Sequence, residues 1–129
     1  MRPRYRLTVS TEFAAAHHLR HYPGDCSRLH GHNWRVEIEV EASALNALGM
    51  AMDFKTIKQA ARTVAAELDH RHLNEIKPFD EINPTAENTA AYFYRGLSGL
   101  LNGPTVRVAA VKIWETDTAA AAYSEEDDT

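Results

Sequence analysis

A chain of 129 residues with 44% hydrophobic and 25% charged residues has the size and composition of one globular domain that buries its own core. A net charge of −4 without any block of Lys and Arg argues against direct nucleic-acid binding. No apolar run reaches the roughly 18 residues that a membrane span needs. Cys26 is the one cysteine, and no N-terminal segment resembles a secretion signal. We therefore expect a reducing, cytoplasmic location and a single domain over residues 1–129.

The first strand is predicted over residues 5–14, where apolar and polar side chains alternate. Continuing this alternation along the chain places His17 on the buried face and His18 on the opposite face. Residues 19–29 contain proline, glycine and aspartate, so we expect them to form a loop.

A second strand is predicted over about residues 31–42, where apolar side chains again occupy every other position. These positions are Trp34, Val36, Ile38 and Val40. His30 and His32 share their parity, and side chains two residues apart lie on one face of a strand. His17, His30 and His32 therefore all extend apolar faces, where an imidazole without a partner is costly.

Two helices are predicted next. Asp53 has the side chain of an N-cap, and apolar residues at helical spacing predict a helix from there to about residue 70. Thr85 is the expected N-cap of the second helix, with Glu87 in its first turn. The Asn-Gly-Pro sequence at residues 102–104 ends this helix.

The last part of the chain returns to strand patterns. Apolar residues occupy every other position in residues 105–116, but they change from even-numbered to odd-numbered positions halfway. This change predicts a bulge near Ala109–Ala110. Glu115 shares the apolar parity of the second half of this strand. Residues 118–129 are predicted to hold a short strand, about 119–124, and a partly disordered acidic tail.

The predicted order of elements is ββααββ. This order is typical of an α+β fold, with an antiparallel sheet that carries both helices on one face. A sheet with so few strands has open edges, which natural proteins usually pair or cover. We therefore expect the chain to form oligomers through these edges.

The three histidines predict a metal site. Neutral imidazoles suit Zn2+, and three protein ligands leave a fourth position open for water or substrate, as in catalytic zinc sites. The alternative is that His17, His30 and His32 are ordinary core or surface histidines. A second alternative is a structural zinc site in which Cys26 supplies a fourth ligand.

Cys26 lies in the predicted loop, four residues before His30. A single cysteine is most often a small buried hydrophobic residue. Here the polar loop, Arg28 and a nearby metal ion would favour the thiolate, so Cys26 is also a candidate for catalysis.

Asp69 and His70 close the first helix. Their functional interpretation is a carboxylate that orients an imidazole for proton transfer, and the alternative is a histidine that favours the helix dipole. Glu115 is an acid among core positions, which either binds a cationic or amidine-like ligand edge or turns to solvent. His18, His21 and His72 are interpreted as ordinary histidines.

Together these residues form a set of motifs that resembles one family. The motifs are Phe13-Ala14-Ala15-Ala16-His17, Cys26-x-x-x-His30-Gly31-His32, Asp53-Phe54, Leu68-Asp69-His70-x-x-Leu73-Asn74, Pro84-Thr85-x-Glu87-Asn88 and Glu115-Thr116. The set resembles the pyruvoyl-tetrahydropterin synthase family over residues 5–124. The spacing from Cys26 to His32 is similar to the bacterial branch, 6-carboxytetrahydropterin synthase of the queuosine pathway.

The resemblance implies the T-fold, in which subunits join edge to edge into a trimeric β-barrel and two trimers stack into a hexamer. It also implies site residues. Zn2+ is held by His17, His30 and His32, and Cys26 is the catalytic thiol. Asp69 and His70 form the proton-transfer pair and reach the site from a neighbouring subunit.

The resemblance further implies that Glu115 anchors the guanidine-like edge of a pterin, with Thr85 and Glu87 at other positions of the pterin pocket. The reaction implied converts 7,8-dihydroneopterin triphosphate to 6-carboxy-5,6,7,8-tetrahydropterin, acetaldehyde and triphosphate. Three alternatives stay open: a 6-pyruvoyl-tetrahydropterin synthase, a non-catalytic zinc-binding module, and a pterin-binding paralogue with an epimerase or aldolase activity.

Overall fold

The chain is built around a five-stranded sheet in the order β3-β1-β2-β4-β5, and the computed structural model describes residues 1–127. The strands are β1 (Tyr5–His17), β2 (His30–Ala42), β3 (Arg71–His72), β4 (Val106–Thr116) and β5 (Ala119–Tyr123). The helices are α1 (Phe54–Ala66) and α2 (Ala86–Leu101), with short 3-10 turns at Asp25–Ser27 and Leu73–Glu75.

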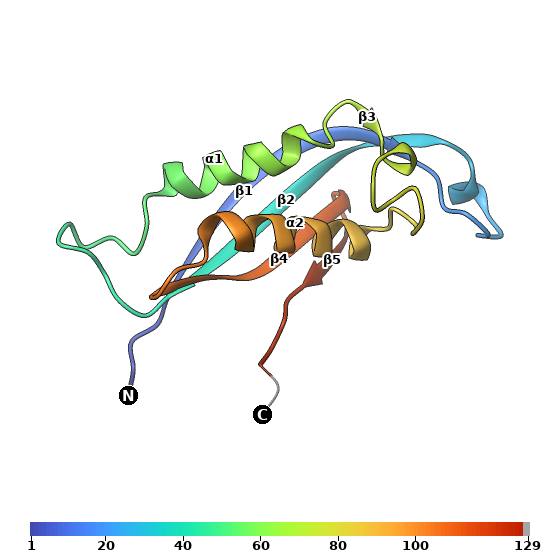
Figure 1. Ribbon diagram of the computed structural model, residues 1–129. Coiled ribbons are helices and arrows are strands. Elements are labelled where there is room, and N and C mark those ends of the chain that lie inside the picture. Colours follow the sequence, from blue (N-terminus) through green and yellow to red (C-terminus); the bar gives the residue numbers. More distant parts are fainter. Residues whose placement is uncertain (128–129) are drawn as a thin grey trace.

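Both helices lie on the same face of the sheet (Figure 1). Each begins at the predicted cap, because the Asp53 carboxylate accepts a hydrogen bond from the amide of Lys55 and the Thr85 hydroxyl accepts one from Asn88. Their apolar sides and the inward side chains of the strands form one core, with Trp34 fully buried in it. The predicted α+β architecture with two helices on one face is confirmed.

β1 and β2 pair antiparallel along their whole length, from Tyr5 opposite Ala42 to His17 opposite His30. Along β2, buried residues alternate with partly exposed ones, as the sequence pattern predicts. Because side chains alternate between faces, this register brings His17, His30 and His32 to the same face at one end of the sheet.

The pairing of β2 with β4 contains the predicted bulge. Glu39 pairs with Ala110 and Val40 pairs with Val108, so Ala109 is the extra residue. The bulge changes which parity faces the helices: Val106 and Val108 are buried before it, Val111 and Ile113 after it. Glu115 continues the second parity and therefore reaches the same face as the histidines.

Two local features differ from the expectations. α1 ends at Ala66, a little earlier than predicted. The segment after it contains β3, which pairs in parallel with Ala15 and Ala16 of β1 and was expected to be loop. Residues 119–123 form the predicted last strand, and the part of the predicted disordered tail at 128–129 lies outside the described residues.

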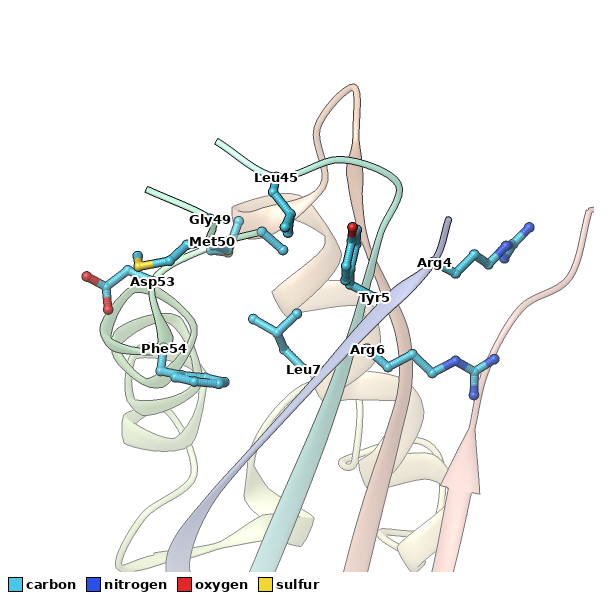
Figure 2. Close-up of a pocket in the computed structure, with 11 residues that line it drawn as sticks. Arg4, Tyr5, Arg6, Leu7, Leu45, Gly49, Met50, Asp53 and Phe54 are labelled. Atoms are coloured by element: carbon cyan, nitrogen blue, oxygen red, sulfur yellow. The ribbon is translucent and has the colours of Figure 1, made fainter. Parts of the chain in front are cut away.

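An apolar cavity of about 560 Å³ lies at the other end of β1, where Tyr5 and Leu7 face the loop before α1 (Figure 2). The carboxylate of Asp53 on its wall caps α1. Arg4 and Arg6 also line the cavity, and they form ion pairs with Glu41 and Glu39. Within residues 1–127, no helix combines the length and the apolar character needed to cross a membrane.

Candidate metal centre and active site

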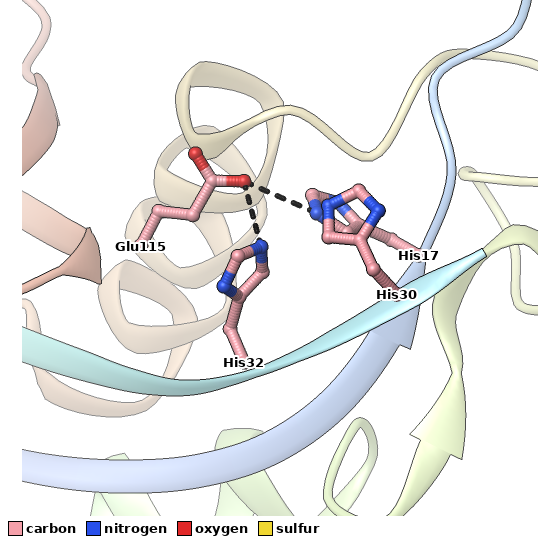
Figure 3. Close-up of side chains that lie close together, drawn as sticks. All are labelled: His17, His30, His32 and Glu115. Carbon is pink, nitrogen blue, oxygen red and sulfur yellow. Dashed lines mark ion pairs between the residues drawn. The ribbon is translucent and has the colours of Figure 1, made fainter. Parts of the chain in front are cut away.

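Four side chains converge where β1 ends and β2 begins (Figure 3). His17 is the last residue of β1, and His30 and His32 lie in the first three positions of β2. Glu115 comes from the end of β4, next to β2 in the sheet. We call His17, His30, His32 and Glu115 the metal centre. The structure thus brings together the three predicted metal ligands and adds the carboxylate.

The atoms of the metal centre that could bind an ion all lie within 4.8 Å of one another. One oxygen of Glu115 lies 3.1 Å from Nε2 of His17 and 3.2 Å from Nε2 of His32. His17 is almost fully buried, whereas the Glu115 side chain is 30% exposed. The centre is therefore closed on the core side and open on the side of Glu115.

Two backbone carbonyls orient the imidazoles. Nδ1 of His17 lies 2.7 Å from the Pro84 carbonyl, and Nδ1 of His30 lies 2.7 Å from the Arg28 carbonyl. A carbonyl only accepts hydrogen bonds, so each Nδ1 carries the proton and each Nε2 keeps a free lone pair. A hydrogen bond of this kind typically fixes the tautomer of a metal-bound histidine.

This arrangement fits a cation. Nε2 of His17 and Nε2 of His32 are buried without a hydrogen bond in the described part of the chain. Both face the same oxygen of Glu115, and because Nε2 of His17 is an acceptor, as that oxygen is, their approach is favourable only with a proton or a cation between them. Burial is the main cause that lowers the pKa of His17 and of His32, although Glu115 raises both. Lowered pKa values favour the neutral imidazole, the form that binds metals.

Cys26 lies beside the metal centre. It is partly buried in the 3-10 turn between β1 and β2 and lines a cavity of about 350 Å³. His30, His32 and Glu115 line the same cavity. Cys26 does not belong to the group of atoms that could share an ion. The predicted thiol thus faces the site from outside the ligand set.

Asp69 and His70 lie elsewhere. One Asp69 oxygen accepts a hydrogen bond from the amide of Ala14 at 2.9 Å, and the other lies 3.0 Å from Nδ1 of His70. These contacts, the amide first, lower the pKa of Asp69. The His70 side chain is 81% exposed and lines a different cavity from Cys26. Asp69 and His70 are thus in contact with each other, and His70 and Cys26 line different cavities of the chain.

Thr85 and Glu87 stand at the start of α2, just after the Pro84 carbonyl that contacts His17. The Thr85 hydroxyl caps the helix, and Glu87 is exposed. Neither lines the cavity of Cys26. Their predicted contact with substrate stays a prediction.

Sequence patterns did not reveal two parts of this site. The carbonyls of Arg28 and Pro84 were missed because a backbone group gives no signal in the residue type. Glu115 was predicted to bind a ligand, and its parity was the signal for its location. Its approach to two imidazoles was not predicted.

Comparison with known proteins agrees with this architecture. The family described as 6-pyruvoyl tetrahydropterin synthase matches residues 6–126, and the chain belongs to this family. The resemblance seen in the sequence motifs is thereby confirmed, and so is the expectation of a pterin lyase at the level of the family.

The chain is also similar to individual proteins of this kind. The chain is 35% identical over 116 residues to a 6-carboxy-5,6,7,8-tetrahydropterin synthase of Synechocystis sp., covering 86% of each chain. It is 34% identical over 110 residues to a dihydroneopterin monophosphate aldolase of Pyrococcus furiosus, covering 85% of this chain and 89% of the relative. The solved 6-pyruvoyl tetrahydropterin synthase of Caenorhabditis elegans superposes with a TM-score of 0.85 at 25% identity, covering 98% and 99% of the two chains.

Proposed function

We propose that this chain is a zinc-dependent 6-carboxy-5,6,7,8-tetrahydropterin synthase of queuosine biosynthesis. It converts 7,8-dihydroneopterin triphosphate to 6-carboxytetrahydropterin, acetaldehyde and triphosphate. The observation that carries the proposal is the metal centre with Cys26 on the wall of its cavity. The name of the Synechocystis relative supports the choice of reaction.

His17, His30 and His32 would hold the ion. Their ring nitrogens converge, and a set of three imidazoles suits Zn2+ while leaving one position for substrate. Bound there, Zn2+ supplies Lewis acidity that polarises and acidifies substrate oxygens. The Pro84 and Arg28 carbonyls hold two of the rings in the required orientation.

Glu115 would position the pterin. One of its oxygens faces the histidines, and its partial exposure leaves the carboxylate accessible from the cavity. A carboxylate accepts paired hydrogen bonds from a guanidine-like edge, which fixes the orientation of a planar ring. The reacting side chain of the substrate is then held close to the metal centre. Thr85 and Glu87 are proposed as further contacts of the pterin.

Cys26 and His70 would move protons. A thiolate and an imidazole both exchange protons near neutral pH, and Asp69 keeps His70 oriented. Because Cys26 and His70 line different cavities of one chain, we propose that His70 serves the Cys26 of a neighbouring subunit. Trimers, stacked in pairs as hexamers, would supply this contact through the open edges of the sheet.

A catalytic cysteine must keep its thiol reduced, and thiols stay reduced in the cytoplasm. We therefore propose a cytoplasmic location. We propose further that the chain is one domain, and the single hydrophobic core supports this.

Two other activities compete with the proposal. A 6-pyruvoyl-tetrahydropterin synthase would use the same groups, and the Pyrococcus furiosus relative makes an aldolase that acts on dihydroneopterin monophosphate a specific candidate. A non-catalytic zinc module would require closed coordination by four protein ligands. The cavity beside the metal centre favours an enzyme instead.

Product analysis separates these activities. Zinc-loaded protein is incubated in parallel with the triphosphate and the monophosphate of 7,8-dihydroneopterin, and products are identified by mass. We expect 6-carboxytetrahydropterin and acetaldehyde from the triphosphate alone. A pyruvoyl product, turnover of the monophosphate alone, or no turnover of either compound by the zinc-loaded protein would each refute the assignment.

A further inference from the structure

His18 and His72 form a second pair of facing imidazoles. His18 directly follows β1 and His72 ends β3, and these two strands are neighbours in the sheet. Nδ1 of His18 lies 3.4 Å from Nε2 of His72, and the ring centroids are 5.5 Å apart. Both residues are partly buried. The backbone therefore presents two imidazole nitrogens side by side at a protected position.

The separation of the two nitrogens suits chelation. Two imidazoles on one tetrahedral ion, each about 2.05 Å from it, have nitrogens about 3.3 Å apart. The observed 3.4 Å lies close to this value and is longer than a good N–H hydrogen bond. Rotation about χ2 of histidine has broad minima, so both rings can turn toward a common ion without leaving their rotamers.

Glu75 supplies a supporting contact. Its carboxylate lies 3.4 Å from Nδ1 of His72, on the side of the ring away from His18. A carboxylate on one ring nitrogen keeps the proton there and leaves the other nitrogen free to bind a metal. Asn74 fixes the backbone of His18 through two hydrogen bonds, both 3.0 Å long. His18 is thus held relative to the segment that carries His72.

The pair is distinct from the metal centre. His72 pairs with Ala16, and Ala16 and His17 point to opposite faces of β1. The pair and the metal centre therefore lie on different sides of the sheet. Within the described residues, the group of His17, His30, His32 and Glu115 is the one found with three or more potential metal ligands in reach of a common ion.

We propose that His18 and His72 bind a second divalent transition-metal ion, with Glu75 as the orienting carboxylate. The ligand set selects ions that prefer imidazole, namely Zn2+, Cu2+ or Ni2+, over Mg2+ and Ca2+, which prefer oxygen. Two protein ligands leave the remaining positions to water, so the ion is exchangeable. Its binding links the end of β1 to the segment of β3 that follows Asp69 and His70.

The proposal is tested by measuring how many zinc ions each chain binds. The full-length protein is dialysed against increasing free Zn2+, and bound zinc per chain is measured by mass spectrometry together with the melting temperature. The variants are His18→Gln, His72→Gln and Glu75→Gln. His21→Gln is the matched control, because His21 is an exposed histidine of the same loop whose side chain has no hydrogen-bond or ion-pair partner among the described residues.

We expect two equivalents of zinc in the wild type and in His21→Gln, and one in His18→Gln and His72→Gln. The retained equivalent and a preserved melting temperature at low zinc show that these variants are folded. Glu75→Gln should need roughly tenfold more free zinc for the second equivalent. A single equivalent in the wild type, or a second equivalent that survives His72→Gln, would overturn the proposal.

Discussion

Replacing Glu115 with Gln separates two roles that its position allows. The carboxylate lies 3.1 Å and 3.2 Å from two Nε2 atoms, so it could be a fourth metal ligand, or it could anchor the pterin as proposed. Gln keeps the size of the side chain and removes the charge. The three imidazoles are unchanged. If Glu115 anchors the pterin, the substitution weakens substrate binding; if Glu115 is a metal ligand, the substitution weakens zinc binding.

We expect the loss to appear in substrate binding. Removing a charged hydrogen-bond acceptor from a bound ligand costs about 1.5–3 kcal/mol, which is roughly a 10- to 150-fold fall in kcat/KM. Zinc affinity should stay within about threefold of the wild type, because the histidine ligands that determine it are intact.

The assay combines steady-state kinetics with zinc competition against a chromophoric chelator. Glu39→Gln is the matched control, since Glu39 is a glutamate of the neighbouring strand β2 that forms an ion pair with the exposed Arg6, at 2.9 Å. An ion pair of this kind contributes little, so this variant should resemble the wild type in both measurements. A large loss of zinc affinity in Glu115→Gln with unchanged KM would refute the pterin-anchor role.

Other outcomes follow from the same geometry. Cys26→Ala should abolish turnover and leave the zinc content unchanged; lost zinc would place the thiol on the metal instead. Mixing the inactive variants Cys26→Ala and His70→Ala should restore activity in about a quarter of the sites if subunits exchange at random, whereas no recovery after verified exchange would exclude a shared site. Tyr92→Phe should lower stability by about 1 kcal/mol, because the Tyr92 hydroxyl donates to the Glu67 carboxylate. Burial, and then Glu67, raise the pKa of Tyr92 above its ordinary 10.0, so wild-type stability should fall as pH rises above that value, and thermal melts of Tyr92→Phe should show a shallower decline.

The alternation of apolar and polar residues along the strands accounts for most of the features of the site that the sequence predicted. The alternation in β1 and β2 placed His17, His30 and His32 on one face because a buried face fixes the register of a strand. The parity change in β4 located the bulge and turned Glu115 inward. Side-chain caps located the starts of both helices because Asp53 and Thr85 act locally.

Contacts that depend on distant backbone were not predictable in this way. β3 has two residues, too few for any periodicity, and it forms because Ala15 and Ala16 offer an edge to pair with. The proximity of His18 to His72 depends on that strand, so sequence reasoning treated both as ordinary histidines. Which cavities Cys26 and His70 line likewise depends on the path of loops, and family resemblance alone indicated a neighbouring subunit.

The bulge at Ala109 determines which face of the sheet each later side chain of β4 occupies. Before it, even-numbered residues face the helices; after it, odd-numbered residues do. The orientation of Glu115 is thus set six positions upstream, by an alanine that is not itself part of the metal centre. Loss of that one residue would turn the carboxylate to the opposite face while leaving the chemistry of every side chain intact. A search for residues that control this site should therefore include the count of residues in β4 as well as their identity.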